Sequence, residues 1–482
     1  MATFRSTNPA RPAEVVAEYP EHGAADVDVA VARASEAQRA WAKRPIPERA
    51  EAIAAVGAIL TARKAELAEL VSREAGKVRI EGGGEVQEAI DMAAFVAGQG
   101  RSAMGEVVPS EMPSKMAYTT RIPVGVVGMI TPWNFPMAIP SWKVFPALLA
   151  GNGVVMKPSE LAPACGVAFM DACIEAGIPA ELLQTVHGGP EPAAALTVHP
   201  GVGAVSFTGS VPTGRKVAAA AMEVGPKLVS LELGGKNAMV VLDDADLELV
   251  LEGALFGAFG TAGQRCTSTS RMIVQRGVAD EVVARLAERA GALRLGDPLD
   301  ATTDVGPVIT ADSGQRIMAM VEAAIGEGAT VATGGQRLDD VDGCEGGTFV
   351  TPTILAGVKP SHAVARHEVF GPVLAVIEVD DLDEAIGVVN SVEYGLSAAV
   401  YTQDINAALR AVDAIDTGIT YVNAPTIGAE IPLPFGGTKH TGNGYREAGS
   451  RGIEQFSQVK TVYIDFSGRL QRAQIDNRED AS

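Results

Sequence analysis

Short apolar runs alternate with alanine-rich segments of helix length from Val124 onward, and this alternation is the strongest constraint on the fold. Repetition of strand, helix and strand predicts parallel βαβ units, because each crossover helix covers a face of the sheet. Ligands of such sheets bind beyond the carboxyl ends of the strands. The predicted strands of this block are 124–130, 154–156, 183–186, 204–207 and 228–231.

A second α/β block follows residue 234. A helical segment at 247–259 precedes strand-like runs at 271–274, 373–379 and 398–401. The sequence therefore predicts an α/β protein with two parallel sheets.

The segments outside the two blocks have other patterns. Helical spacing begins at Asp26, and a longer second helix is predicted from Pro47, because proline fits the first helical position. This second helix carries one apolar stripe, made of Ile53, Val56, Leu60, Leu67 and Val71. Residues 105–123 hold two short strands around a polar turn, which predicts a hairpin that projects from the main body, and 459–466 is a further strand.

Composition and charge exclude several classes of protein. The net charge of −20 argues against nucleic-acid binding, since phosphate neutralisation needs a basic surface. Four cysteines in 482 residues, with no CxxC or HExxH motif, predict that the protein binds no metal. The first residues lead into prolines and charges, and no uninterrupted apolar run is long enough to span a membrane. We expect a cytoplasmic protein.

Cys266 lies in a small, polar stretch at 263–267, a setting that the other cysteines lack. A thiolate is a strong nucleophile near neutral pH when it has access and a lowered pKa, so Cys266 is a candidate catalytic residue. The alternative is a buried cysteine without chemistry.

Two further residues stand at predicted strand ends. Glu232 follows an apolar run and precedes two glycines, where apolar surroundings raise a carboxyl pKa toward the range of a general base. Asn134 follows the first parallel strand between two prolines, and its amide can donate to an oxyanion. The alternatives are a salt-bridged glutamate and an Asx turn.

Two loops have features suited to a nucleotide. Residues 209–214 open a helix after a strand, so their N–H groups can hold a pyrophosphate, although the GxGxxG pattern is absent. Lys157 and Glu160 follow another strand, where a basic and an acidic side chain can contact a ribose.

Taken together, these residues resemble the aldehyde dehydrogenase superfamily, and the likeness extends over nearly the whole chain. Seven segments carry it in order: 132–136 (PWNFP), 157–160 (KPSE), 207–210 (FTGS), 232–236 (ELGGK), 263–266 (GQRC), 368–372 (EVFGP) and 434–439 (PFGGTK).

The resemblance implies three parts. Residues 1–104 and 124–234 would form a Rossmann-like NAD-binding domain, and 235–440 an α/β catalytic domain. Residues 105–123 and 455–470 would form a small β oligomerisation element. We expect a homodimer or a homotetramer.

The resemblance also implies residue roles. Cys266 would be the nucleophile, Glu232 the general base, and Asn134 an oxyanion donor together with the backbone N–H of Cys266; Lys143 is also assigned to the catalytic set. The expected cofactor-binding residues are Trp133, Lys157, Ser159, Glu160, Gly209, Ser210, Glu368 and Phe370. A carboxylate at Glu160 would accept the ribose hydroxyls and repel a 2′-phosphate, which predicts NAD over NADP.

The reaction expected from this set is oxidation of a small-molecule aldehyde to the acid through a Cys266 thioester, which water activated by Glu232 hydrolyses. A CoA-acylating relative would lack this base, and an inactive structural relative would lack part of the triad Cys266, Glu232 and Asn134. An insertion near Glu447 leaves its role in a proton relay open.

The substrate is expected to be a semialdehyde with a distal carboxylate. Arg265, beside the nucleophile, and the N–H groups around Gly428 and Ala429 can bind that carboxylate, as in the semialdehyde branch that the chain resembles. The other expected substrate-contacting residues are Phe135, Trp142, Thr267 and Phe435. In the alternative, Arg265 forms a structural ion pair and the pocket takes uncharged aldehydes.

Overall fold

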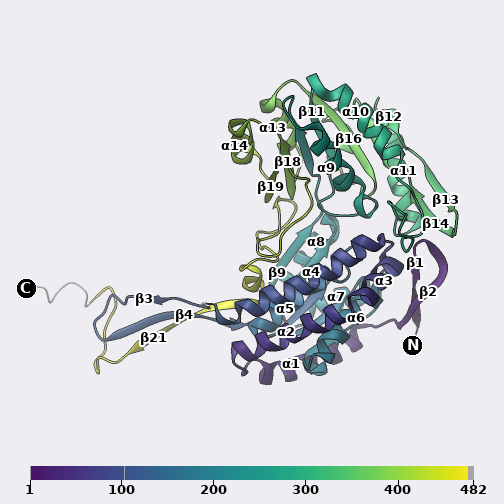
Figure 1. The fold of residues 1–482 in the computed structure, drawn as a ribbon. Helices are drawn as coiled ribbons and strands as arrows, with labels where there is room; N and C mark the ends of the chain where they lie inside the picture. The colour runs from purple at the N-terminus through teal and green to yellow at the C-terminus, as the bar shows by residue number, and fades with distance from the viewer. Residues whose placement is uncertain (1, 103, 476–482) are drawn as a thin grey trace, which may run out of the picture.

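The computed structural model describes residues 2–102 and 104–475, which form two lobes and a long arm (Figure 1). The lower lobe in Figure 1 contains a five-stranded sheet in the order β7-β6-β5-β8-β9, and every neighbouring pair is parallel. The strands are β5 (Val126–Ile130), β6 (Gly153–Lys157), β7 (Leu183–Thr185), β8 (Val202–Gly209) and β9 (Leu228–Leu233). The five strands predicted for the first block are therefore confirmed.

Helices cover both faces of this sheet, which explains why its strands are continuous apolar runs. Val127 and Met129 of β5 pack into the core that contains α2, α4, α5 and α6, whereas Val126 and Ile130 face α1, α7 and α8. The helices are α1 (Ala24–Trp41), α2 (Ile46–Ala62), α3 (Lys64–Ala75), α4 (Arg79–Gly98), α5 (Ala138–Ala150), α6 (Pro163–Glu175), α7 (Pro190–Val198) and α8 (Val211–Glu223), with short 3₁₀ turns η1 (Gln99–Arg101) and η2 (Ala180–Leu182).

The prediction of one long helix from Pro47 is wrong, because the chain bends at Arg63 between α2 and α3. Arg63 has φ −99° and ψ 9°, and its guanidinium contacts Glu66 of the next turn at 2.7 Å. Leu60 and Leu67 still enter the same core on either side of the bend. The apolar stripe is therefore real, although it belongs to two helices.

The second sheet lies in the upper lobe, with strand order β12-β15-β16-β11-β10-β18-β19. Its pairs are parallel except that β12 is antiparallel to β15. The strands are β10 (Ala238–Val241), β11 (Arg271–Gln275), β12 (Thr330–Thr333), β15 (Thr353–Ala356), β16 (Val373–Val379), β18 (Ser397–Tyr401) and β19 (Ile419–Val422). The three strands predicted here are confirmed, and four others were missed.

Helices also cover both faces of the second sheet. Met239 and Val241 of β10 pack with α9 and α10, whereas Ala238 and Val240 pack with α11 and α13. The helices are α9 (Leu247–Phe259), α10 (Arg276–Gly291), α11 (Ala311–Gly326), α12 (Ala363–Arg366), α13 (Leu382–Asn390) and α14 (Ile405–Ala414). The smaller elements are η3 (Gly260–Gly263), β13 (Arg337–Val341), β14 (Cys344–Val350), β17 (Tyr394–Gly395), β20 (Thr438–Lys439) and η4 (Gly452–Phe456).

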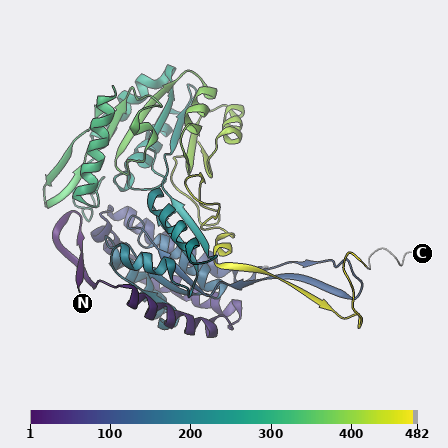
Figure 2. The same ribbon diagram turned by 180° about the vertical axis from the view of Figure 1, so that it is seen from behind.

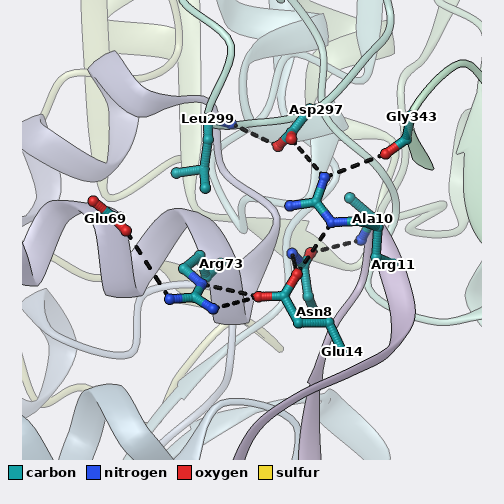
Figure 3. Close-up of polar contacts among 9 residues, drawn as sticks. All are labelled: Asn8, Ala10, Arg11, Glu14, Glu69, Arg73, Asp297, Leu299 and Gly343. Carbon is teal, nitrogen blue, oxygen red and sulfur yellow. Dashed lines mark hydrogen bonds and ion pairs between the residues drawn. The ribbon is translucent and has the colours of Figure 1, made fainter.

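An N-terminal hairpin that the sequence analysis missed joins the two lobes. Its strands β1 (Thr3–Asn8) and β2 (Arg11–Pro20) pair antiparallel, and the hairpin lies beside β13 and β14 (Figure 1). Figure 3 shows the ion pairs at its tip: Arg11 contacts Asp297 of the upper lobe at 2.5 Å, and Glu14 contacts Arg73 of α3 at 2.5 Å. The hairpin is thus bonded to both lobes.

The arm confirms the predicted projecting hairpin. Strands β3 (Val107–Val108) and β4 (Lys115–Pro123) pair antiparallel, and β21 (Ser457–Asp465) pairs with β4 from Ser457 opposite Pro123 to Asp465 opposite Lys115. Figures 1 and 2 both show this three-stranded sheet extending away from the two lobes. Within the described residues, no helix combines the length and the apolar character that a membrane crossing requires.

Candidate active site

A cavity of about 370 Å³ brings together side chains that are far apart in the sequence. Cys266, Glu232 and Asn134 all line it, as do the predicted cofactor residues Trp133, Gly209, Ser210, Glu368 and Phe370 and all seven predicted substrate residues, Phe135, Trp142, Arg265, Thr267, Gly428, Ala429 and Phe435. Four predicted residues do not line it: Lys143, Lys157, Ser159 and Glu160. Most of the predicted site is therefore one physical pocket.

Cys266 follows a left-handed turn at the end of α9. Thr261, Ala262 and Gly263 have φ values of 54°, 49° and 67°, a conformation that is costly for residues with a Cβ. A side chain at Gly263 would clash with the backbone carbonyl of Gly371, so this position requires glycine. The turn carries the chain out of the helix and presents Cys266 to the cavity.

The pKa of the Cys266 thiol is raised to about 12, chiefly by burial and then by the charges of Glu368, Glu232 and Glu447. Burial disfavours the thiolate, and the carboxylates that surround the sulfur add to this effect because they disfavour a further negative charge. The thiol needs a base or a nearby positive charge before it can attack.

Arg265 is bonded to the turn that precedes Cys266. Its Nε donates to Thr261 Oγ1 at 2.9 Å, and its guanidinium forms an ion pair with Glu81 of α4 at 3.0 Å. Glu81 also accepts the Thr261 N–H at 2.7 Å. The structural ion pair that the sequence analysis held as the alternative is thus present, and Arg265 lines the cavity at the same time.

Asn134 lies in the loop between β5 and α5 and is 5% exposed. Its Nδ2 donates to the carbonyl of Gln264 at 3.0 Å, which brings the amide next to the Cys266 loop. A carboxamide has two N–H groups, so this arrangement suits an oxyanion donor that is fixed by its other bond.

Glu232 lies near the end of β9, and its carboxyl is buried. It is 3% exposed, and neither carboxyl oxygen has a hydrogen-bond partner. Burial raises the pKa of Glu232 well above its ordinary value, and the charge of Glu447 adds to the shift. A side chain at Gly436 would come 2.7 Å from Glu232 Oε1, so glycine is required for this carboxyl to fit.

Lys143 is buried on α5 behind the cavity. It forms an ion pair with Glu447 and donates to Ser206 Oγ at 2.8 Å. Glu447 lines the cavity, and its charge acts on both Glu232 and Cys266. The insertion noted near Glu447 therefore does not remove this carboxylate from the site.

The loop between β8 and α8 lies at one end of the cavity and fits a pyrophosphate. Ser210 is the N-cap of α8 but forms no side-chain cap bond to the helix, so its side chain does not satisfy the first N–H groups. Ser210 Oγ instead donates to Thr213 at 3.0 Å.

Glu368 and Phe370 lie across the cavity from this loop. Glu368 Oε1 accepts the Gly235 N–H at 3.2 Å, and a side chain at Gly234 would clash with the Glu368 carboxylate. Burial raises the pKa of Glu368 to about 7. Phe370 has φ 55°, and its ring meets Trp133 edge-on at 5.7 Å between centroids.

Lys157 is the last residue of β6 and Glu160 lies in the loop that follows; both are outside the cavity and form an ion pair at 2.9 Å. Ser159, between them, accepts the Leu161 N–H. The structure thus brings the basic and acidic side chains of this loop together at the edge of the sheet where ligands bind in such folds.

Aromatic rings form the opposite wall of the cavity. Trp142 meets Phe435 edge-on at 5.0 Å between centroids. Lys77 lies over the Phe135 ring, with Nζ 3.4 Å from its centroid, and Arg265 lies 5.5 Å from the same ring. Phe135 is therefore in contact with two cations, which favours a fixed ring orientation.

Sequence reasoning missed Glu88 on α4 and Arg316 on α11, and both line the cavity. The pKa of Glu88 is raised to about 7 by burial and by the charge of Glu85. Arg316 donates to Ser313 Oγ at 2.9 Å in its own helix. A charged residue on an amphipathic helix is normally a solvated one, so neither position carries a local signal.

The comparison with known proteins agrees with this geometry. The family model described as "Aldehyde dehydrogenase family" matches residues 1–462. An alpha-ketoglutarate semialdehyde dehydrogenase of Haloferax volcanii is 41% identical over 96% of this chain and 96% of its own. A betaine aldehyde dehydrogenase of Cereibacter sphaeroides is 39% identical over 94% of this chain and 92% of its own.

The fold is also similar to that of a solved structure. The betaine aldehyde dehydrogenase of Staphylococcus aureus in complex with NAD+ superposes with a TM-score of 0.94 at 32% identity, over 97% of this chain and 93% of the other. A match of this extent in both sequence and fold, around a cavity with a cysteine, a glutamate and an asparagine, leaves one assignment. The chain belongs to the aldehyde dehydrogenase family and is an oxidoreductase that oxidises aldehydes to acids.

Proposed function

We propose that this enzyme oxidises an aldehyde with a distal carboxylate to the corresponding diacid, with NAD as the hydride acceptor. The observation that carries the proposal is the single cavity in which Cys266, Glu232 and Asn134 meet beside two arginines, Arg265 and Arg316. The lobe of the first sheet would bind the cofactor, and the lobe of the second sheet supplies the nucleophile.

The three residues divide the chemistry. Once the Cys266 thiol has lost its proton to water, Sγ adds to the aldehyde carbon, and the amide of Asn134 stabilises the resulting oxyanion. NAD, when bound, would supply the hydride acceptor, and loss of the hydride from the aldehyde carbon would leave a thioester on Cys266. Glu232 then removes a proton from the water that hydrolyses the thioester, and the Glu447–Lys143 pair behind it can take that proton onward.

A single-turnover experiment on Glu232→Gln tests this division. We expect a burst of NADH close to the enzyme concentration and then stalled turnover, because the thioester forms but is not hydrolysed. Steady turnover at the parent rate would remove Glu232 from the mechanism. Cys266→Ser is the control and should give no burst.

The proposed cofactor site fits NAD. The N–H groups of the first turn of α8 suit a pyrophosphate, and Glu160 in the loop after β6 suits the hydroxyls of the adenosine ribose. A carboxylate at that place repels a 2′-phosphate. We expect kcat/KM with NAD to exceed kcat/KM with NADP. Glu160→Gln should reduce the difference between the two cofactors. Equal kcat/KM values for NAD and NADP in the parent enzyme would contradict the predicted preference for NAD.

Support for the distal carboxylate comes from charge and from the semialdehyde relative of Haloferax volcanii. Arg265 uses Nε and one terminal nitrogen for Thr261 and Glu81, and guanidinium has five N–H donors. Gly428, with φ 98°, and Ala429 line the same cavity and are further candidates to contact the carboxylate.

A second candidate substrate is an aldehyde with a quaternary ammonium group. The aromatic wall of Phe135, Trp142 and Phe435 and the carboxyl of Glu88 are groups that attract such a cation. The betaine aldehyde relative of Cereibacter sphaeroides favours this reading.

A panel of three aldehydes of matched length, ending in a carboxylate, a methyl group or a trimethylammonium group, separates the candidates. We expect the carboxylate to have the highest kcat/KM and Arg265→Met to reduce this advantage. Preference for the trimethylammonium aldehyde would establish the second candidate. Indifference to the end group would indicate a broad enzyme for uncharged aldehydes.

A further inference from the structure

We propose that Asn237 is a positioning residue that fixes the nucleophile Cys266 relative to the general base Glu232. The inference deepens the proposed function and rests on the roles assigned there to these two residues. Asn237 lies immediately before β10, in the short link that leaves β9 after Glu232 and enters the second sheet.

The Asn237 side chain makes three hydrogen bonds to the backbone. Its Nδ2 donates to the carbonyl of Cys266 at 2.8 Å and to the carbonyl of Ser268 at 2.9 Å. Its Oδ1 accepts the N–H of Ser397 at 3.1 Å. The residue is 3% exposed, so water does not compete for these bonds.

The backbone of the same residue binds the far side of the nucleophile loop. The Asn237 carbonyl accepts the Arg271 N–H at 3.1 Å and Ser270 Oγ at 3.2 Å. The loop from Cys266 to Arg271 is thus bonded to Asn237 at both ends.

These contacts set the place of the sulfur. Holding the Cys266 carbonyl fixes the peptide that follows its Cα, and therefore limits the directions that Cβ and Sγ can take. Asn237 is connected to Glu232 through Gly234 and Gly235, and the Gly235 N–H is itself bonded to Glu368. The segment 232–237 therefore contains the base and is hydrogen-bonded to both the Cys266 loop and Glu368.

Only a primary amide of this length meets the requirement. The site offers two carbonyls and one N–H, which an asparagine side chain matches with two donors and one acceptor. Aspartate has the same shape but no donor, so it would face both carbonyls with a negative charge. Alanine would leave all three groups without their partner.

The chain contains a matched control at Asn152. This residue is also buried, and its Nδ2 donates to the carbonyls of Ala147 and Phe456 at 3.0 and 2.8 Å while its Oδ1 accepts the Gly125 N–H at 3.0 Å. It makes the same three kinds of bond but lies outside the cavity. Asn152→Ala therefore reports what the loss of such an amide does to stability alone.

The experiment compares Asn237→Ala, Asn237→Asp and Asn152→Ala in the full-length enzyme. Three quantities are measured: the melting temperature, the rate of iodoacetamide alkylation at the Cys266 peptide as a function of pH, and kcat with KM for the aldehyde and NAD. Mass analysis of the peptide separates Cys266 from the buried Cys165, Cys173 and Cys344.

We expect both Asn237 variants to lower kcat by about 10- to 100-fold, the scale of a misplaced reacting group, with KM for NAD nearly unchanged. The pH profile of Cys266 alkylation should shift in the same variants. Asn152→Ala should lose a similar amount of stability and keep the parent kcat and alkylation profile.

Parent kcat and parent alkylation in Asn237→Ala would overturn the proposal, and so would equal losses of activity in Asn152→Ala. If Asn237→Asp fails to fold, the alanine variant decides. A failure of the proposed function can be told apart from a failure of this inference. If Cys266 is not the nucleophile, its alkylation in the parent enzyme would leave turnover intact.

Discussion

At the scale of single residues, burial and the nearby carboxyl groups together set the acidity of Cys266. Burial raises the pKa of the thiol most, and the charges of Glu368, Glu232 and Glu447 raise it further. The resting enzyme therefore holds a protonated and weakly reactive cysteine. Deprotonation then depends on a partner that accepts the proton or supplies positive charge.

Removing one of these charges should make the thiol more acidic. In Glu368→Gln, the Gly235 N–H keeps an acceptor oxygen, but a negative charge near the sulfur is lost. We expect alkylation of Cys266 at pH 8 to accelerate by about threefold or more, since less charge opposes the thiolate. Glu345→Gln, at an exposed position of β14, is the control. An unchanged or slower rate would contradict the electrostatic explanation.

Glu88 should make stability depend on pH. Its folded pKa, raised to about 7, exceeds the value in an unfolded chain, so the folded state retains a proton that the unfolded state releases. Stability contributed by this group is intact below the unfolded pKa and falls as pH rises toward 7. We expect Glu88→Gln to gain about 1–3 kcal/mol of unfolding free energy at pH 8 and little at pH 4.5.

Denaturant titrations at the two pH values measure this difference, with Glu51→Gln at an exposed position of α2 as the control. An equal effect of Glu88→Gln at both pH values would show that the carboxyl does not titrate between them. Below neutral pH, the same protonated carboxyl would also repel a substrate carboxylate less.

The residues of the site differ in how far sequence predicts them. Glu232 and Asn134 lie near glycines or prolines at strand ends, and Cys266 follows a glycine-containing turn at the end of α9. Local pattern carries information at such places. Glu88 and Arg316 lie within helices and reach the cavity only because α4 and α11 pack against distant segments. Their proximity to Cys266 is a property of tertiary packing, which no local pattern encodes.

At the scale of elements, the left-handed turn before Cys266 is held by side chains. Glu81 of α4 accepts the Thr261 N–H and pairs with Arg265, so a helix of one lobe supports a turn of the other. Two of the three turn residues have a Cβ and are strained in this conformation.

Loss of Glu81 should release this turn. We expect Glu81→Ala to lower kcat by about tenfold or more and to reduce the melting temperature, because a buried N–H and a buried guanidinium lose their partner. Glu81→Gln retains an acceptor and should have an intermediate effect. Glu252→Ala, on α9 away from the turn, is the control, and parent kinetics in Glu81→Ala would exclude a role in positioning.

Helices and strands were predicted correctly where a single hydrophobic pattern runs through the whole element. The strands of the first sheet are apolar on both faces and were found, whereas the bend at Arg63 was missed because the stripe continues across it. The N-terminal hairpin was missed because β2 is largely exposed and holds its place through charged contacts such as Arg11 with Asp297. Its stability comes from the lobes that it joins.

At the scale of the whole molecule, the arm exposes apolar side chains far from both lobes. Val107, Val459, Tyr463 and Phe466 are 80%, 61%, 66% and 65% exposed. Apolar groups gathered on an edge sheet of this kind need cover, which supports the proposed dimer or tetramer.

Charges on the arm should prevent that association. We expect the double variant Val459→Glu, Tyr463→Glu to have a lower mass by light scattering than the parent, because the glutamates would be desolvated in an interface. The equivalent change at Ile405 and Leu409 of α14, which are 65% and 60% exposed, is the control. A parent mass in the arm variant would place the interface elsewhere.

The link at 234–237 has a consequence for how sequences of this kind can vary in evolution. Glu232 belongs to the first sheet, and Asn237, which is bonded to the Cys266 carbonyl, leads into the second. The number of residues between them therefore helps to determine the distance between base and nucleophile. An inserted or deleted residue there would move Glu232 relative to Cys266, whereas loops elsewhere can vary in length without this effect. Functional relatives should therefore conserve the length of this link more strictly than its side chains, and an alignment of active enzymes can test that rule.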